Sequence, residues 1–99
     1  MIADVVWWDL GAADGGTLAR LRSDLDDAAL RSWSAVPGLR MKLWLADPAG
    51  WRWGAVMLWD GSPRPAAELP NNQAAELIGR TPDRRMRFDV AAAVPGGLP

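Results

Sequence analysis

Residues 36–60 contain two apolar runs separated by a short turn, and this arrangement constrains the fold more than any other part of the chain. The runs GLRMKLWLA and WRWGAVMLW flank the turn Asp47-Pro48-Ala49-Gly50. A proline-containing turn between two such runs is typical of a β-hairpin. Five of the seven tryptophans lie in or beside this hairpin, so aromatic packing is expected around it: Trp33, Trp44, Trp51, Trp53 and Trp59.

Residue periodicity predicts the remaining elements, because strands alternate every two residues and helices repeat every 3.6. In chain order they are a strand at 2–10, a helix at 18–34 capped by Thr17, strands at 39–46 and 51–59, short helical pieces at 66–69 and 72–78, and a strand at 85–92. This order predicts one α+β domain over residues 1–99 with the ferredoxin-like β-α-β-β-α-β arrangement, a four-stranded antiparallel sheet with two helices on one face. Residues 94–99 are expected to form a tail, flexible or docked on a partner.

Alternation within the hairpin strands predicts which side chains face the helices. In the strand at 51–59, one face carries Trp51, Trp53, Ala55, Met57 and Trp59. In the strand at 39–46, we assign to the helices the apolar residues Leu39, Met41, Leu43 and Leu45, which leaves Arg40, Lys42 and Trp44 on the other side. Glycine inside a strand indicates close approach of another backbone or side chain, and this is expected at Gly54.

The second face of the sheet is expected to be an interface between two copies of the chain. It is predicted to carry several apolar side chains, too many to leave in water: Val5, Trp7, Trp44, Val56 and Leu58. The predicted homodimer contacts are Trp7, Arg40, Lys42, Trp44, Val56 and Leu58. Arg40 and Lys42 are assigned to ion pairs across this interface; the alternative is that they hold an acidic substrate or stabilise an enolate.

Composition excludes several classes of function. The chain has no cysteine, histidine or tyrosine, which excludes disulfides, zinc–thiolate sites and Ser-His-Asp catalysis. A net charge of −1, with acids and bases interspersed, argues against nucleic acid or an anionic membrane as partner. No apolar run has the length of a membrane span, and no signal-like N-terminus is visible, so a cytoplasmic location is expected. Abundant Ala, Gly, Arg, Asp and Pro with one lysine is typical of GC-rich bacterial genomes.

Clustered aromatic residues are candidates for a small-molecule pocket suited to a flat ring system. The predicted substrate-binding residues are Trp8, Trp33, Met41, Trp53, Met57, Trp59, Asn72 and Phe88. The alternative is that the large aromatics fill the core of a small domain and that Asn71 and Asn72 only cap a helix. The carboxylates at Asp24, Asp26 and Asp27 are interpreted as a solvated helix face, and no metal or other cofactor is expected.

Three short motifs resemble those of the YdhR-type mono-oxygenase family. Pro37-Gly38-Leu39-Arg40-Met41-Lys42-Leu43-Trp44 is similar to the P-G-x-x-x-K-x-W signature of that family. The segment from Gly54 to Trp59 resembles its glycine-led third strand, and Phe88-Asp89-Val90 resembles the Phe-Asp-Val that closes its last strand. Order and spacing are nearly preserved over almost the whole chain. The chain departs from the family at Pro70, which interrupts the second helix.

The resemblance implies a dimeric α/β barrel, a homodimer with two sheets packed face to face and helices outside. It also implies a cavity between each sheet and its own helices. Some members of this superfamily oxidise polycyclic phenols with molecular oxygen and without metal or flavin. The resulting hypothesis is a cofactor-independent mono-oxygenase acting on an aromatic or polyketide-like small molecule. The alternatives are a non-catalytic binding module, and an isomerase or cyclase that uses a carboxylate such as Asp9.

Overall fold

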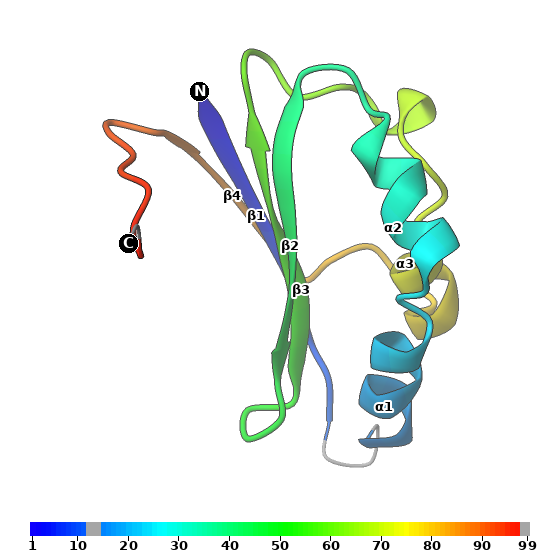
Figure 1. The fold of residues 1–99 in the computed structure, drawn as a ribbon. Helices are drawn as coiled ribbons and strands as arrows, with labels where there is room; N and C mark the ends of the chain where they lie inside the picture. Colours follow the sequence, from blue (N-terminus) through cyan, green and yellow to red (C-terminus); the bar gives the residue numbers. More distant parts are fainter. Residues whose placement is uncertain (12–14, 98–99) are drawn as a thin grey trace.

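The protein is an α+β domain in which helices cover one face of an antiparallel sheet (Figure 1). A computed structural model describes residues 1–11 and 15–97. Within these ranges the elements are β1 (Ile2–Asp9), α1 (Gly15–Ser23), α2 (Asp27–Ser34), β2 (Leu39–Asp47), β3 (Arg52–Trp59), the 3₁₀ turn η2 (Ala66–Glu68), α3 (Gln73–Ile78) and β4 (Arg84–Asp89). The described strands pair antiparallel in the order β2-β3-β1-β4, which is compatible with a ferredoxin-like fold.

The helical segment after β1 is broken into α1 and α2, so the expectation of one continuous helix capped by Thr17 was wrong. Asp26 has extended backbone dihedrals (φ −87°, ψ 175°), and its Oδ1 accepts a hydrogen bond of 2.8 Å from the amide of Ala29. This bond satisfies a free amide of the first turn of α2, which makes a new helix start at this point favourable. Thr17 instead lies inside α1, which begins at Gly15.

Helix α3 follows η2 and has well-defined ends. The side chain of Asn72 accepts a hydrogen bond of 3.0 Å from the amide of Ala75. Gly79 ends the helix in the left-handed conformation with φ 87°, where glycine has no steric penalty. The expected stop at Gly79 is therefore confirmed, and Asn72 is the cap rather than the first helical residue.

The core lies between the sheet and the helices, in two clusters of buried side chains. One cluster contains Trp8, Leu10, Leu18, Leu21 and Trp53, and the other contains Val36, Met57 and Trp59. Gly54 is required where β3 pairs with Trp7 of β1. A Cβ atom at this position would overlap the carbonyl oxygen of Val6 and lie 2.8 Å from Cβ of Trp7. The close approach expected at Gly54 is therefore confirmed.

The side chains of β2 face opposite ways from those expected, because the pairing of β2 with β3 fixes their orientation. Lys42 pairs with Met57 and Trp44 pairs with Ala55, and both partners are buried on the face covered by helices. Directly paired residues share a face, so Lys42 and Trp44 also point towards the helices. Met41, Leu43 and Leu45 point to the other side. Leu39 alone faces the helices as expected, because a bulge at Arg40 adds one residue between Leu39 and Met41.

The face of the sheet opposite the helices is uncovered, as Figure 1 shows, and we call it the open face. It carries apolar side chains from all four strands: Val5, Trp7, Met41, Leu43, Leu45, Val56, Leu58, Met86 and Phe88. The most exposed of these, Met41, Leu43, Leu45, Met86 and Phe88, have 45–51% of their surface accessible. No helix formed by residues 1–11 or 15–97 is long and apolar enough to cross a membrane.

Candidate functional site

A pocket lies between the sheet and the helices, where the strand residues Trp44 and Trp53 meet α2 and the segment 70–74. Its outer chamber has a volume of about 340 Å³ and is bordered at the rim by Asp24 and Asp26. An inner chamber of about 240 Å³ adjoins it and reaches Val6, Ala55 and Arg85 on the sheet. The two chambers share the walls Trp33, Lys42, Trp44, Trp53, Pro70, Asn71, Asn72 and Ala74. The dimensions and the indole walls suit a small aromatic molecule.

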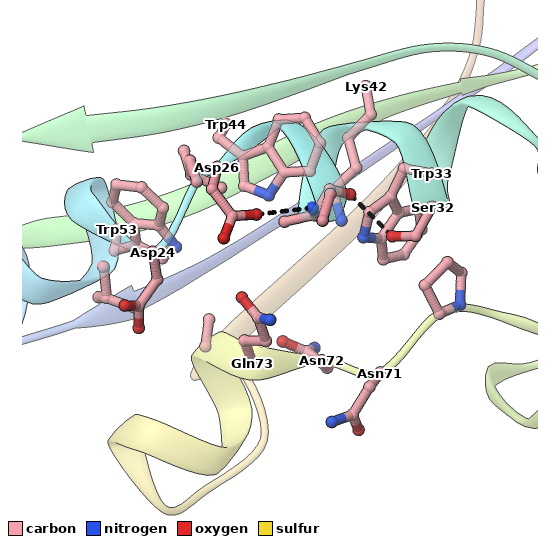
Figure 2. A pocket seen from close by; sticks show the side chains of 16 residues that line it. Asp24, Asp26, Ser32, Trp33, Lys42, Trp44, Trp53, Asn71, Asn72 and Gln73 are labelled. Atoms are coloured by element: carbon pink, nitrogen blue, oxygen red, sulfur yellow. Dashed lines mark hydrogen bonds between the residues drawn. The ribbon is translucent and has the colours of Figure 1, made fainter.

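Lys42 lies at the junction of the two chambers and packs against two tryptophans (Figure 2). Its Nζ atom is 3.1 Å from the ring centroid of Trp33 and 4.7 Å from that of Trp44. The two indoles meet edge to face, with centroids 6.4 Å apart and planes at 84°. Within the described part of the chain, Lys42 forms no ion pair with a carboxylate. A half-buried amine without a counter-ion is unusual, because buried charges are normally paired.

The protonation state of Lys42 follows from this environment. Burial removes water from the ammonium group and lowers the pKa of Lys42 to about 7. The negative faces of the indole rings act in the opposite sense, because they favour the cation. The amine and the ammonium forms are therefore both populated near neutral pH. Such a group can accept a proton from a bound molecule and can then stabilise the anion that forms.

The other polar side chains at the pocket are mostly engaged in holding the structure together. Asp26 caps α2, Asn72 caps α3, and Asp24 accepts a hydrogen bond of 3.1 Å from Arg20. Asn71 donates a hydrogen bond of 2.9 Å from Nδ2 to Oε1 of Glu76. Figure 2 shows Asn71 and Asn72 on one side of the pocket, and Lys42, Trp33 and Trp44 on the other. Lys42 is thus the best candidate for chemistry.

The structure brings together most of the predicted substrate-binding residues. Trp8, Trp33, Trp53, Met57 and Asn72 line the pocket. Trp59 is only 1% exposed and belongs to the core cluster beside the pocket. Met41 and Phe88 lie on the open face, because they pair with Leu58 and Ala3 respectively. These two residues are separated from the pocket by the sheet.

The residues predicted for a dimer interface divide between both sides of the sheet. Trp7, Val56 and Leu58 lie on the open face. Lys42 and Trp44 lie on the pocket side instead, which corrects their assignment. Arg40 lies at the bulge and forms an ion pair of 3.1 Å with Asp60. Asp9, considered as a catalytic carboxylate, is exposed. Like Val5 and Trp7 on the same strand, it is on the open face, away from the pocket.

The sequence contains a signal that identifies Lys42 and Trp44 as pocket residues. In a hairpin with the turn at residues 48–51, Asp47 pairs with Arg52, and each step of one residue away from the turn on both strands gives the next pair. This count places Trp44 opposite Ala55 and therefore on the same side as Trp53. No comparable signal identifies Arg85, because the position of β4 depends on its pairing with the distant strand β1.

Comparison of the chain with models of known protein families and with curated proteins gave no match.

Proposed function

We propose that the protein is an enzyme that binds a flat aromatic or polyketide-like small molecule in the pocket, with Lys42 as the base that deprotonates it. Cofactor-independent mono-oxygenation is the reaction we assign. The supporting observation is the position of Lys42 at the junction of the two chambers, among Trp33, Trp44 and Trp53. Among the described residues this amine has no carboxylate partner. A ring system between these indoles would lie next to the amine.

In the proposed reaction, the neutral amine of Lys42 removes a proton from an activated CH₂ group or a phenol of the substrate. The Lys42 ammonium then lies beside the resulting enolate or phenolate and stabilises its charge. The electron-rich carbanion reduces molecular oxygen directly. Overall, a CH₂ group and O₂ yield a C=O group and water, and all four electrons come from the substrate, so no external reductant is needed.

An isomerase or cyclase is the second candidate, because the same enolate is its first intermediate. The observation that favours it is again the position of Lys42, which supplies a proton acceptor but adds nothing that is specific to oxygen. Oxygen uptake separates the two candidates. A binding module without catalysis would use the tryptophan walls but would not need an amine whose pKa lies near 7.

The experiment combines binding with oxygen consumption. Tryptophan fluorescence is titrated with anthrones, naphthols and flat lactones, and every compound that gives saturable quenching is carried into an oxygen electrode. We expect one class of compound to bind the wild type and to be consumed together with oxygen. In Lys42→Met, the affinity for that compound should stay within about threefold, while the rate of oxygen uptake should fall at least about a hundredfold, as expected for the loss of a general base. Saturable binding with oxygen uptake that is equal in both proteins would refute the role of Lys42.

We also propose that the open face is covered by a second copy of the chain, so that two sheets face each other. The support is the continuous set of apolar side chains on this face, five of which have 45–51% of their surface accessible. In this arrangement the helices and the mouth of each pocket would remain on the outside. We propose a cytoplasmic location for the protein as well.

A further inference from the structure

An arginine pair lies beside the inner chamber on the edge strand β4. Arg85 and Arg87 are two residues apart and therefore point to the same face, the one that carries the helices and the pocket. Both pack against the buried carboxylate of Asp4 on β1. The distances from Asp4 Oδ1 are 3.5 Å to Nε of Arg85 and 3.6 Å to Nε of Arg87. Arg85 also forms part of the wall of the inner chamber.

The charges of this group do not cancel. Two guanidinium groups share one carboxylate, and Asp89, further along the strand, forms no ion pair with Arg87 within the described residues. The ion-pair contact of Asp4 with each arginine is made to its Nε atom. The terminal nitrogens of both side chains make no hydrogen bond in the described part of the chain, and each side chain is about half exposed, at 53% and 52%.

This geometry is typical of a preorganised anion-binding site. The side chain of Asp4 is only 4% exposed, and its Oδ1 has no hydrogen-bond partner among the described residues. The carboxylate therefore attracts both guanidinium groups but leaves N–H donors of each available. Guanidinium groups bind carboxylates through two parallel N–H donors, and such charge-assisted bonds are stronger than neutral ones.

We infer that Arg85 and Arg87, positioned by Asp4, form a subsite for the carboxylate of an aromatic acid whose rings occupy the pocket. This inference rests on the proposed function, since it names the substrate class for the same pocket. The rings would lie between the indoles next to Lys42, and the acid group would extend through the inner chamber towards β4. Neutral polycyclic compounds would bind more weakly than their carboxylated counterparts.

The test compares 6-hydroxy-2-naphthoate with 2-naphthol, which differ only in the carboxylate. Calorimetry at low ionic strength should show about tenfold tighter binding of the naphthoate, which is the size expected for one exposed charge-assisted contact. Arg85→Gln and Arg87→Gln should each reduce this preference to about threefold or less. Arg84→Gln, on the same strand but paired with Trp7 and facing the opposite way, is the matched control and should keep it. Added salt should weaken the preference because it screens exposed charges.

NMR separates failure of this inference from failure of the proposed function. Naphthoate should shift the Nε–H resonances of Arg85 and Arg87 and leave that of Arg84 in place. Both ligands should shift the indole N–H resonances of Trp33 and Trp44. Indole shifts without arginine shifts, or equal affinity for the two ligands, would overturn the subsite and leave the pocket intact. Arginine shifts without indole shifts would retain an anion site but overturn the aromatic pocket. No shift at either place would overturn both.

Discussion

The Nζ atom of Lys42 lies 3.1 Å from the centroid of the Trp33 indole, so the only lysine of the chain contacts an aromatic ring where a carboxylate partner would be usual. Contact with a ring stabilises an ammonium group less than a carboxylate does, and burial opposes the charge. The energies of the two protonation states are therefore close near neutral pH. This balance makes Lys42 sensitive to pH in a way that stability measurements can detect.

The contribution of Lys42 to stability should depend on pH. Its pKa is about 7 in the folded state and 10.5 when unperturbed, so between these values the unfolded chain binds the extra proton. Wild-type stability should therefore gain from Lys42 as pH rises from about 7 towards 10. Lys42→Met lacks this gain, so the variant should be more stable relative to wild type at pH 6 than at pH 9. Urea denaturation of both proteins at both pH values measures the difference; parallel pH profiles would contradict it.

Two carboxylates act at the opposite end of the pH scale and do not disturb this measurement. Hydrogen bonds from the Gly50 amide and the Arg52 side chain lower the pKa of Asp47, and the Arg80 side chain together with the Asp9 amide lowers the pKa of Asp83. A lowered carboxyl pKa contributes stability above the unfolded pKa and loses it as pH falls through the folded pKa. Both contributions are therefore constant between pH 6 and 9.

Gly54→Ala should destabilise the protein by about 1–3 kcal/mol, the usual cost of forcing extra atoms into a closely packed site. The added Cβ would overlap the Val6 carbonyl, which is part of the β1 backbone and cannot move aside easily. Gly61→Ala is the matched control, because its Cβ would meet no atom within 4 Å. Urea denaturation should show a change of less than about 0.5 kcal/mol for the control. Equal effects of the two substitutions would argue against the close approach of β1 and β3 at Gly54.

Asp26→Ala should cost about 1 kcal/mol, because the substitution removes the side-chain acceptor of the Ala29 amide at the start of α2. Asp26→Asn keeps an acceptor oxygen at the same place and should retain most of the stability. Thermal unfolding of both variants gives the comparison. A loss in the asparagine variant as large as in the alanine variant would indicate that charge, rather than capping, is the contribution of Asp26.

Leu43→Glu should convert the proposed dimer into a monomer. Leu43 is 47% exposed in the single chain and lies on the open face, where a carboxylate would have to be buried between two sheets. Leu77→Glu, on α3 with an exposure of 39%, is the control and should not change the association state. Sedimentation equilibrium at micromolar concentration distinguishes the outcomes. A monomeric wild type would refute the dimer before any variant is made.

Local signals in the sequence predict most elements. They do not predict which face of β2 is covered, or that the helical segment after β1 is divided into α1 and α2. The hairpin around Asp47 and Gly50 was predictable because its turn chemistry and flanking alternation agree. The faces of β2 were not predictable from hydrophobicity, because both faces of this sheet carry large apolar side chains, Trp44 on one and Leu43 on the other. Alternation shows that a strand has two faces, and only its pairing shows which face is covered.

The break between α1 and α2 was not predicted, for a different reason. Apolar spacing continues across the break, so periodicity alone predicts one helix from Leu18 onwards. Asp26 overrides that periodicity with one hydrogen bond, and an aspartate before a helical segment is a recognisable start signal. The pocket residues Trp8 and Trp53 were predicted from the clustering of large aromatic side chains, because β1 and β3 are apolar on both faces. Arg85 was not, since its location depends on a pairing across about eighty residues.

The bulge at Arg40 has a consequence for the length of the chain. With the extra residue present, Leu39 pairs with Trp59 and Met41 pairs with Leu58, although Leu58 and Trp59 are consecutive. If Arg40 were deleted, regular alternation from Met41 would still direct Leu39 to the helices. The connection from α2 can thus gain or lose one residue at this point while Lys42 keeps its place at the pocket. Related chains whose α2–β2 loops differ in length by one residue can therefore be expected to share the same pocket wall.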